Sequence, residues 1–172
     1  LKYLPKKIRG QIGLLYLLAR VADTIADSMH GETEELLRLL SEYNDVAQGR
    51  SNELPDLSQI ADIQENESEA ELLRNVQDVI EGLDVYSAGD KERMLECLDT
   101  IVGGQILDLE RFGPANEGET ISALVDNAEM DDYTFRVAGC VGVFWTKMTL
   151  AHMFTMSREK EEEFFMKGIR FG

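Results

Sequence analysis

Four polar side chains share one face of a strongly apolar segment near the start of the chain. The segment reads LLYLLARVADTIADS, and Tyr16, Arg20, Asp23 and Asp27 follow one another at intervals of four, three and four residues. These intervals place them along one side of an α-helix, with the two carboxylates one turn apart. Carboxylates in apolar surroundings need a cation or a dense shell of hydrogen bonds. Mg²⁺ meets this need, because it takes oxygen ligands and commonly bridges one or two carboxylates to a phosphate.

The same residues also have a simpler interpretation, in which Arg20 pairs with Asp23 and Asp27 is solvated beyond the helix end. Two observations favour a metal and phosphate site. Tyr16 extends the polar face, and residues 1–20 contain five basic side chains and no acidic one, in a chain with a net charge of −16. This basic start is either a solubilising end or an anion site. In an anion site, Arg20 would hold a phosphate oxygen.

A second constellation lies in the stretch DDYTFRVAGCVGVFWTKM. Gly139 and Gly142 each cost roughly 1 kcal/mol relative to alanine inside a helix. Tyr133, Val137 and Val141 follow one another at intervals of four, so a phenol stands at the end of a valine-lined strip. The small residues predict either close packing of two helices or room for an apolar ligand, with Tyr133 as its polar guide.

A third stretch, GGQILDL, repeats the pattern of small residues next to an acid. Gly103 and Gly104 leave an expected helix without side chains at two positions, one turn before Asp108. From the residues alone, Asp108 is a buried partner for an arginine or a helix cap.

The elements that position these residues are all expected to be helices, since no segment shows the alternation of a β-strand. Pro5 suits a first helical turn, Asp90 an N-cap, and Gly49 and Gly113-Pro114 helix ends. A loop at 114–120 precedes a short helix at 121–128. The longer expected helices cover about 5–28, 32–49, 68–83, 90–113, 132–155 and 157 onward. The sequence therefore predicts an all-α protein.

Length and composition bound the class of protein. The 172 residues suit one domain, the net charge of −16 argues against a nucleic-acid partner, and no apolar run reaches the ~20 residues of a membrane span. Cys97 and Cys140 lack the spacing of metal ligands. We therefore expect a reduced, cytoplasmic compartment.

Three stretches together resemble the squalene/phytoene synthase family, the head-to-head prenyl synthases. LPKKIRGQIGLLYLLARVADTIAD is similar to the family's first aspartate-rich motif, and GGQILDL to its Gly-Met-x-x-Asp-Leu helix. YTFRVAGCVG resembles its most specific signature, Tyr-x-x-x-Val-Ala-Gly-x-Val-Gly. The order and approximate spacing of the stretches fit as well.

The resemblance implies an isoprenoid-synthase-type helical bundle around a central cavity. It also implies a role for each matching residue. Asp23 and Asp27 would bind Mg²⁺ ions that clamp a substrate diphosphate, and Arg20 would contact that diphosphate. Tyr133 would guide the carbocation steps. The remaining residues implied to bind substrate are Tyr16, Asp108, Val137, Gly139 and Val141.

The resemblance implies a Mg²⁺-dependent prenyltransferase that joins two prenyl diphosphates, farnesyl diphosphate above all, through a cyclopropyl diphosphate to squalene. Squalene formation would use NADPH, whereas phytoene or dehydrosqualene formation needs no reductant. Two alternatives stay open: a farnesyl diphosphate phosphatase on the same fold, and a non-catalytic helical scaffold. Release of a hydrocarbon product implies peripheral membrane contact. The sequence does not indicate an oligomeric state.

The sequence also departs from the family pattern. The second aspartate-rich motif and the C-terminal helices are absent, and so is the Ser/Phe-containing flap expected before Leu1. We therefore expect residues 1–172 to form a single, partial isoprenoid-synthase domain that is incomplete at both ends and inactive in isolation.

Overall fold

The structure, a computed structural model, describes residues 2–28, 32–113 and 123–172. Within these ranges the secondary structure is helical and contains no β-strand, so the predicted all-α class is confirmed. The helices form a bundle of the isoprenoid-synthase type. None of the described helices is both long and apolar enough to cross a membrane.

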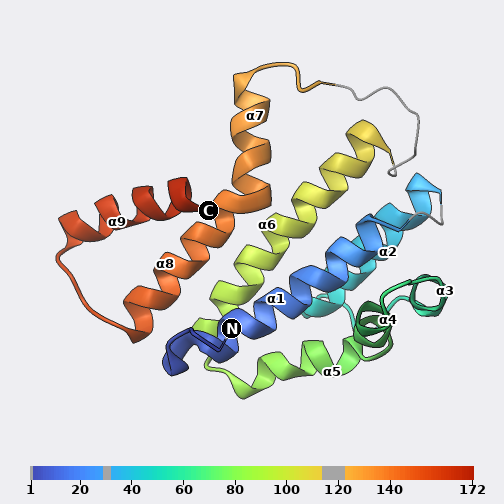
Figure 1. Cartoon of the computed structure of the whole chain (residues 1–172), viewed down its shortest axis with the longest axis horizontal. Helices are drawn as coiled ribbons and strands as arrows, with labels where there is room; N and C mark the ends of the chain where they lie inside the picture. The colour runs from blue at the N-terminus through green and yellow to red at the C-terminus, as the bar shows by residue number, and fades with distance from the viewer. Residues whose placement is uncertain (1, 29–31, 114–122) are drawn as a thin grey trace.

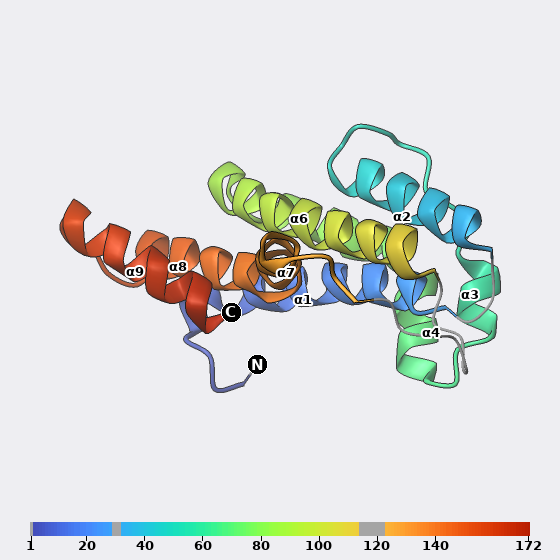
Figure 2. The ribbon, with the colours of Figure 1, turned by 90° about the horizontal axis from the view of Figure 1, so that it is seen from above.

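One long helix organises the bundle (Figures 1 and 2). This is α6 (Ala88–Phe112), and three further long helices contact it: α1 (Lys6–Ala26), α2 (Thr33–Ala47) and α8 (Cys140–His152). Helix α1 lies along the length of α6 and also contacts α2 and α8. Side chains on α1 and α6 are therefore held side by side over several turns.

Shorter elements surround these four helices. Helices α3, α4 and α5, with the 3₁₀ segment η1, connect α2 to α6, while α7, the π-helical segment η2 and α9 flank α8 (Figure 1). Their bounds are α3 Ser58–Asp62, α4 Glu67–Arg74, α5 Val76–Glu81, η1 Gly82–Val85, α7 Asn127–Thr134, η2 Phe135–Gly139 and α9 Arg158–Phe171.

Several of the expected helix boundaries are wrong. The single helix expected over 68–83 is divided into α4, α5 and η1. The N-cap of α6 is Ser87, whose side chain accepts a hydrogen bond from the Asp90 amide at 3.2 Å, so Asp90 lies inside the first turn. Pro5 directly precedes α1, and the helix ends at Ala26, which makes Asp27 its C-cap. Gly49 and Gly113 follow their helices as expected, and both have positive φ, 74° and 70°.

The expected helix over 132–155 is longer and less regular than its pattern indicates. It begins at Asn127, widens into a π-helical turn over Phe135–Gly139 and ends at His152. Residues 123–126 of the expected short helix are not helical. The predicted loop at 114–120 and residues 121–122 lie outside the described residues.

The core forms where apolar faces of the four long helices meet. Tyr43 of α2 is completely buried and its hydroxyl donates to the Leu18 carbonyl at 2.8 Å, which ties α2 to α1. The other fully buried large side chains are Leu18, Val21, Ile25, Leu36, Leu40, Leu73, Leu83, Met94, Leu98, Val102 and Met148. With Leu18, Val21 and Ile25 turned inward, the polar face of α1 is left away from this core.

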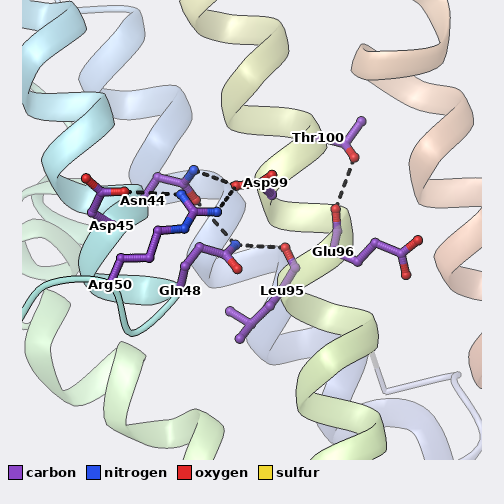
Figure 3. A network of polar contacts seen from close by, with 8 residues as sticks. All are labelled: Asn44, Asp45, Gln48, Arg50, Leu95, Glu96, Asp99 and Thr100. Atoms are coloured by element: carbon purple, nitrogen blue, oxygen red, sulfur yellow. Dashed lines mark hydrogen bonds and ion pairs between the residues drawn. The ribbon is translucent and has the colours of Figure 1, made fainter.

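A polar network links α2 to α6 at the edge of the core (Figure 3). Asn44 donates to Asp99 at 2.8 Å, and Gln48 donates to the Leu95 carbonyl at 2.9 Å. Arg50 bridges Asp99 and Asp45 at 2.9 and 3.1 Å. These contacts fix how far α2 is displaced along α6.

Buried Asp90 joins three helices in the first turn of α6. Its carboxylate accepts from Gln11 of α1 at 3.2 Å and contacts the His152 ring of α8 at 2.8 Å and Arg93 at 3.3 Å. Burial raises the pKa of Asp90, but the hydrogen bonds from His152 and Gln11 outweigh it and hold the pKa below its ordinary value.

The Asp90→Asn variant tests this linkage. Because the folded pKa is lowered, the ionised carboxylate stabilises the fold above the ordinary aspartate pKa of about 3.9, and this contribution is lost as the pH falls through the folded pKa. We expect Asp90→Asn to lower the free energy of unfolding by about 1–3 kcal/mol at pH 7. The difference from wild type should shrink towards zero below pH ~3.9. Urea unfolding across pH measures it, and a constant difference would contradict the linkage.

Candidate active site

The polar face of α1 lies at the boundary between the core and solvent. Tyr16 is 59% exposed, the Arg20 side chain is 40% exposed, Asp23 is half-buried and Asp27 is exposed. The four residues lie on successive turns of one helix, as the spacing predicted. Solvent exposure therefore varies along this face. Asp23 is its less exposed acid and lies against α6.

Asp23 has one direct partner from α6. The side-chain amide of Gln105 donates a hydrogen bond to its Oδ1 atom. Burial, and then the charge of Asp27, raise the pKa of Asp23, while Arg20 and the Gln105 hydrogen bond act in the opposite direction. The net upward shift means that the carboxylate is incompletely compensated where it lies.

Two buried oxygen atoms on the same stretch of α6 have no hydrogen-bond partner among the described residues. They are Gln105 Oε1 and Asp108 Oδ1, from side chains one turn apart. Burial raises the pKa of Asp108, and the charge of Arg111 opposes this shift. Buried acceptors are normally satisfied by a donor, a water or an ion. This part of α6 therefore offers two acceptors to a water or a ligand, one of them on the Gln105 side chain that contacts Asp23.

Arg20 is engaged by an acid that the sequence analysis did not consider. Its guanidinium pairs with Glu69 of α4 at 2.5 Å, and this hydrogen bond raises the Arg20 pKa. Glu69 also accepts from Asn66 at 3.1 Å. The ion pair that the structure describes for Arg20 is thus with Glu69, whereas the simpler interpretation of the sequence had paired Arg20 with Asp23.

The basic start of the chain is partly structural. Arg9 donates to the backbone carbonyls of Lys2 and Leu4, at 2.8 Å for Lys2 and 3.1 and 2.5 Å for Leu4. Its guanidinium thereby fastens the residues before α1. Lys6 and Lys7 are exposed at the beginning of that helix.

The π-helical segment η2 packs against the glycine pair on α6. A Cβ atom at Gly104 would lie 2.9 Å from the Arg136 Cβ, and one at Gly103 would lie 3.2 Å from the Arg136 guanidinium. Arg136 belongs to η2 and pairs with Asp132 at 2.9 Å. Gly103 and Gly104 therefore allow close approach of η2 to the middle of α6.

The glycines of the second constellation face α9. A Cβ atom at Gly142 would lie 1.9 Å from the Gly168 carbonyl oxygen, and one at Gly139 would lie 3.0 Å from Phe135 and 3.5 Å from the Ile169 carbonyl oxygen. Of the two interpretations of this small-residue stretch, the contacts at Gly142 are those of close helix packing. A role for Gly139 in substrate binding stays a prediction.

The remaining predicted residues lie on the chain that continues from α7 into α8. Tyr133 is half-buried on α7, Val137 is 53% exposed in η2, and Val141 is half-buried in α8. Their spacing is that of one helix face, interrupted by the π-helical turn. Their roles toward a substrate stay predictions, as does the central cavity.

The donor set on α1 and α6 fits a hard cation only in part. The described residues contain no group of three histidine, cysteine or acidic side chains that could hold a metal ion. Two carboxylates one turn apart, with buried orphan oxygens nearby, nevertheless suit Mg²⁺, which keeps several waters and shares its remaining positions with phosphate oxygens. The two carboxylates can thus bind a cation whose remaining positions are filled by water and by an anionic ligand.

Gln105 and Glu69 are the two residues at this face that the sequence analysis missed. Gln105 lies three residues before Asp108 in GGQILDL, so its presence on the same helical face was readable. Its contact with Asp23 depends on how α1 and α6 are aligned, which the sequence does not show. Glu69 lies 49 positions after Arg20, and no pattern in the sequence indicates that the two side chains meet.

The all-α bundle, with an aspartate pair on one long helix, is consistent with the class of helical isoprenoid-synthase folds. The sequence profile of the squalene/phytoene synthase family matches residues 1–164. The chain therefore belongs to this family. None of the curated proteins matches it.

The Gly142→Ala variant tests the packing of α9. No methyl group fits 1.9 Å from the Gly168 carbonyl, so α9 must move away from α8. Because α9 has no buried residue, the loss should stay local. We expect faster amide hydrogen exchange over 158–171 and unchanged exchange in α1, α2 and α6.

Gly89→Ala is the matched control, because the nearest atom to its Cβ, 3.0 Å away, is the end of the flexible Arg93 side chain. Unaltered hydrogen exchange of α9 in the Gly142→Ala variant would show that the packing of α9 on α8 does not depend on the contact between Gly142 and Gly168.

Proposed function

We propose that the protein is a Mg²⁺-dependent head-to-head prenyltransferase that joins two prenyl diphosphates through a cyclopropyl diphosphate. Farnesyl diphosphate is the proposed substrate, and squalene or a related C30 hydrocarbon the product. Membership of the squalene/phytoene synthase family supports the reaction class. The observation that carries the assignment to this site is the half-buried Asp23 with its raised pKa, whose partner Gln105 carries one of the two unpartnered buried oxygens of α6.

Asp23 and Asp27 are the residues that would hold Mg²⁺. When bound, the ion neutralises the diphosphate and makes it a better leaving group. The protein contributes the placement of both carboxylates on one helical face, with Gln105 fixing the orientation of Asp23. Gln105 is thus a positioning residue, since it acts through Asp23.

Arg20 is the proposed contact to the diphosphate. Its guanidinium lies one turn before Asp23 and can donate two parallel hydrogen bonds to phosphate oxygens. To do so it must exchange Glu69 for the ligand. The exposed Tyr16, one turn further back, would line the entrance for the first substrate.

Tyr133 is proposed to act near the allylic cation, since a phenol places a dipole and an aromatic face beside positive charge. Val137 and Val141 would contact the prenyl chain, with Gly139 leaving space between them. Asp108 would act near the diphosphate through the orphan oxygen that it presents beside Gln105.

The product decides among the remaining alternatives. Incubation of the full-length protein with farnesyl diphosphate and Mg²⁺ should give a C30 hydrocarbon. Squalene would require added NADPH and dehydrosqualene would not, while phytoene would require geranylgeranyl diphosphate. Farnesol would identify a phosphatase, and absence of turnover would favour a helical scaffold. We propose a cytoplasmic protein that contacts membranes only peripherally, because the product is a hydrocarbon.

Asp23→Asn and Asp27→Asn test the metal role. Each change removes a ligand charge at nearly constant shape, so we expect turnover to fall at least about 100-fold. Helicity and unfolding temperature should stay near wild type. Asp78→Asn, at an exposed position on α5, is the matched control and should keep full activity. Wild-type turnover in either α1 variant would exclude the metal role.

Glu69→Gln tests whether the ion pair with Glu69 competes with phosphate binding by Arg20. Removing the Glu69 charge leaves Arg20 free for phosphate, so inorganic pyrophosphate with Mg²⁺ should bind more tightly, by up to about fivefold. Calorimetric titration measures the affinity. Glu67→Gln, which loosens only the exposed pair with Arg74, should leave the affinity unchanged. Weaker binding in Glu69→Gln would show that Glu69 orients Arg20 rather than competing for it.

A further inference from the structure

The two cysteines of the chain lie against each other between α6 and α8. Cys97 and Cys140 are each 4% exposed and line the same small pocket, where each thiol shifts the pKa of the other. Both are free thiols. Neither cysteine is a residue of the proposed active site, although Cys140 lies between Gly139 and Val141, which are proposed to accommodate the prenyl chain. The proximity of the two cysteines does not depend on that role.

The surroundings make the two thiols unequal. The Cys140 thiol donates to the Arg136 carbonyl at 3.1 Å. Interaction with the Cys97 thiol lowers the pKa of Cys140 against the effect of burial, whereas interaction with the Cys140 thiol and burial both raise the pKa of Cys97. Cys140 is thereby the better nucleophile, and Cys97 is the neighbour that can react with it next.

Both cysteines line one small pocket. Its volume is about 40 Å³, and its lining includes Cys97, Cys140, Arg93, Lys147 and Phe144. This is room for about three water molecules. Hydrogen peroxide, which is little larger than water, fits such a space, whereas a tripeptide disulfide does not. Arg93 and Lys147 bring positive charge to the lining, which favours a thiolate, although Arg93 pairs with Asp90 and Lys147 with Glu96, a further lining residue.

We propose that Cys97 and Cys140 form an oxidation site that takes hydrogen peroxide and closes to a disulfide between α6 and α8. The Cys140 thiolate attacks one peroxide oxygen, the O–O bond breaks, and the departing hydroxide takes a proton to leave as water. The sulfenic acid formed on Cys140 is then attacked by the Cys97 sulfur. An S–S bond forms, the S–O bond breaks and a second water leaves. The two thiols supply the two electrons that reduce the peroxide.

The disulfide would connect the central helix of the bundle to α8. It closes a loop of the chain that includes the rest of α6, α7 and η2, so it restricts the unfolded state. The same cross-link holds the α6 segment that carries Gln105 and Asp108 at a fixed position relative to η2, which packs on Gly103 and Gly104. Oxidation should therefore stiffen the bundle without requiring any new contact.

The test treats the reduced full chain with substoichiometric hydrogen peroxide. We expect the mass to fall by two hydrogens, a Cys97–Cys140 peptide in the non-reducing digest, and a rise in Tm of roughly 5–10 °C that dithiothreitol reverses. In Cys97→Ser, Cys140 should stop at the sulfenic acid and be trapped by dimedone. In Cys140→Ser, Cys97 should stay reduced.

The exposed Met153 is an internal control in the same digest, because its oxidation reports that peroxide was active. Three results would overturn the proposal. They are unmodified cysteines beside oxidised Met153, Cys140 oxidised to sulfinic acid without a cross-link, and disulfides that join two chains. Each is read from the wild-type protein, so the conclusion does not depend on how well the serine variants fold.

Discussion

The contact of Asp23 with α6 is the constraint on which the candidate site depends. A carboxylate that leaves water loses solvation, and Asp27 one turn away adds repulsion, so the pKa of Asp23 is raised. Opposing this are the Gln105 amide and Arg20, whose guanidinium is already paired with Glu69. The side chain is therefore well positioned but poorly neutralised. An aspartate with a purely structural role would be more stable with a partner that neutralises its charge fully. An aspartate that binds a cation must keep part of its charge unneutralised until the cation arrives.

The placement of Asp23 follows from the packing of the long helices. Leu18, Val21 and Ile25 are fully buried, which fixes the rotation of α1 about its axis. The Tyr43 hydroxyl on the Leu18 carbonyl and the Asp90 carboxylate on Gln11 fix its position along the bundle. With rotation and translation both set, Asp23 must lie beside Gln105. The active-site geometry is thus determined by contacts that are themselves remote from the proposed chemistry.

The parts of the site that could be predicted from sequence are those encoded within one helix. The intervals between Tyr16, Arg20, Asp23 and Asp27 depend only on helical geometry, and the all-α class depends only on periodicity. The partners from other helices could not be predicted, because Gln105 and Glu69 reach α1 through the alignment of separate elements. Local competition explains the misplaced cap of α6, where Ser87 and Asp90 both suit an N-cap and only Ser87 precedes the first turn. The glycines were recognised as a signal, but only the structure shows that Gly142 faces Gly168.

The acidity of the chain determines how a site for an anion can be built in it. In a protein with net charge −16, an arginine left alone would attract whichever carboxylate can reach it. Arg20 is accordingly paired with Glu69, in a contact whose side chains are 40% and 21% exposed and which is therefore worth about 0–1 kcal/mol. That is a weak hold compared with two charge-assisted hydrogen bonds to a diphosphate accompanied by Mg²⁺. Glu69 can keep the guanidinium in place without preventing its exchange. The same acidic surface that repels anions therefore also supplies the counter-ion that the proposed diphosphate would replace.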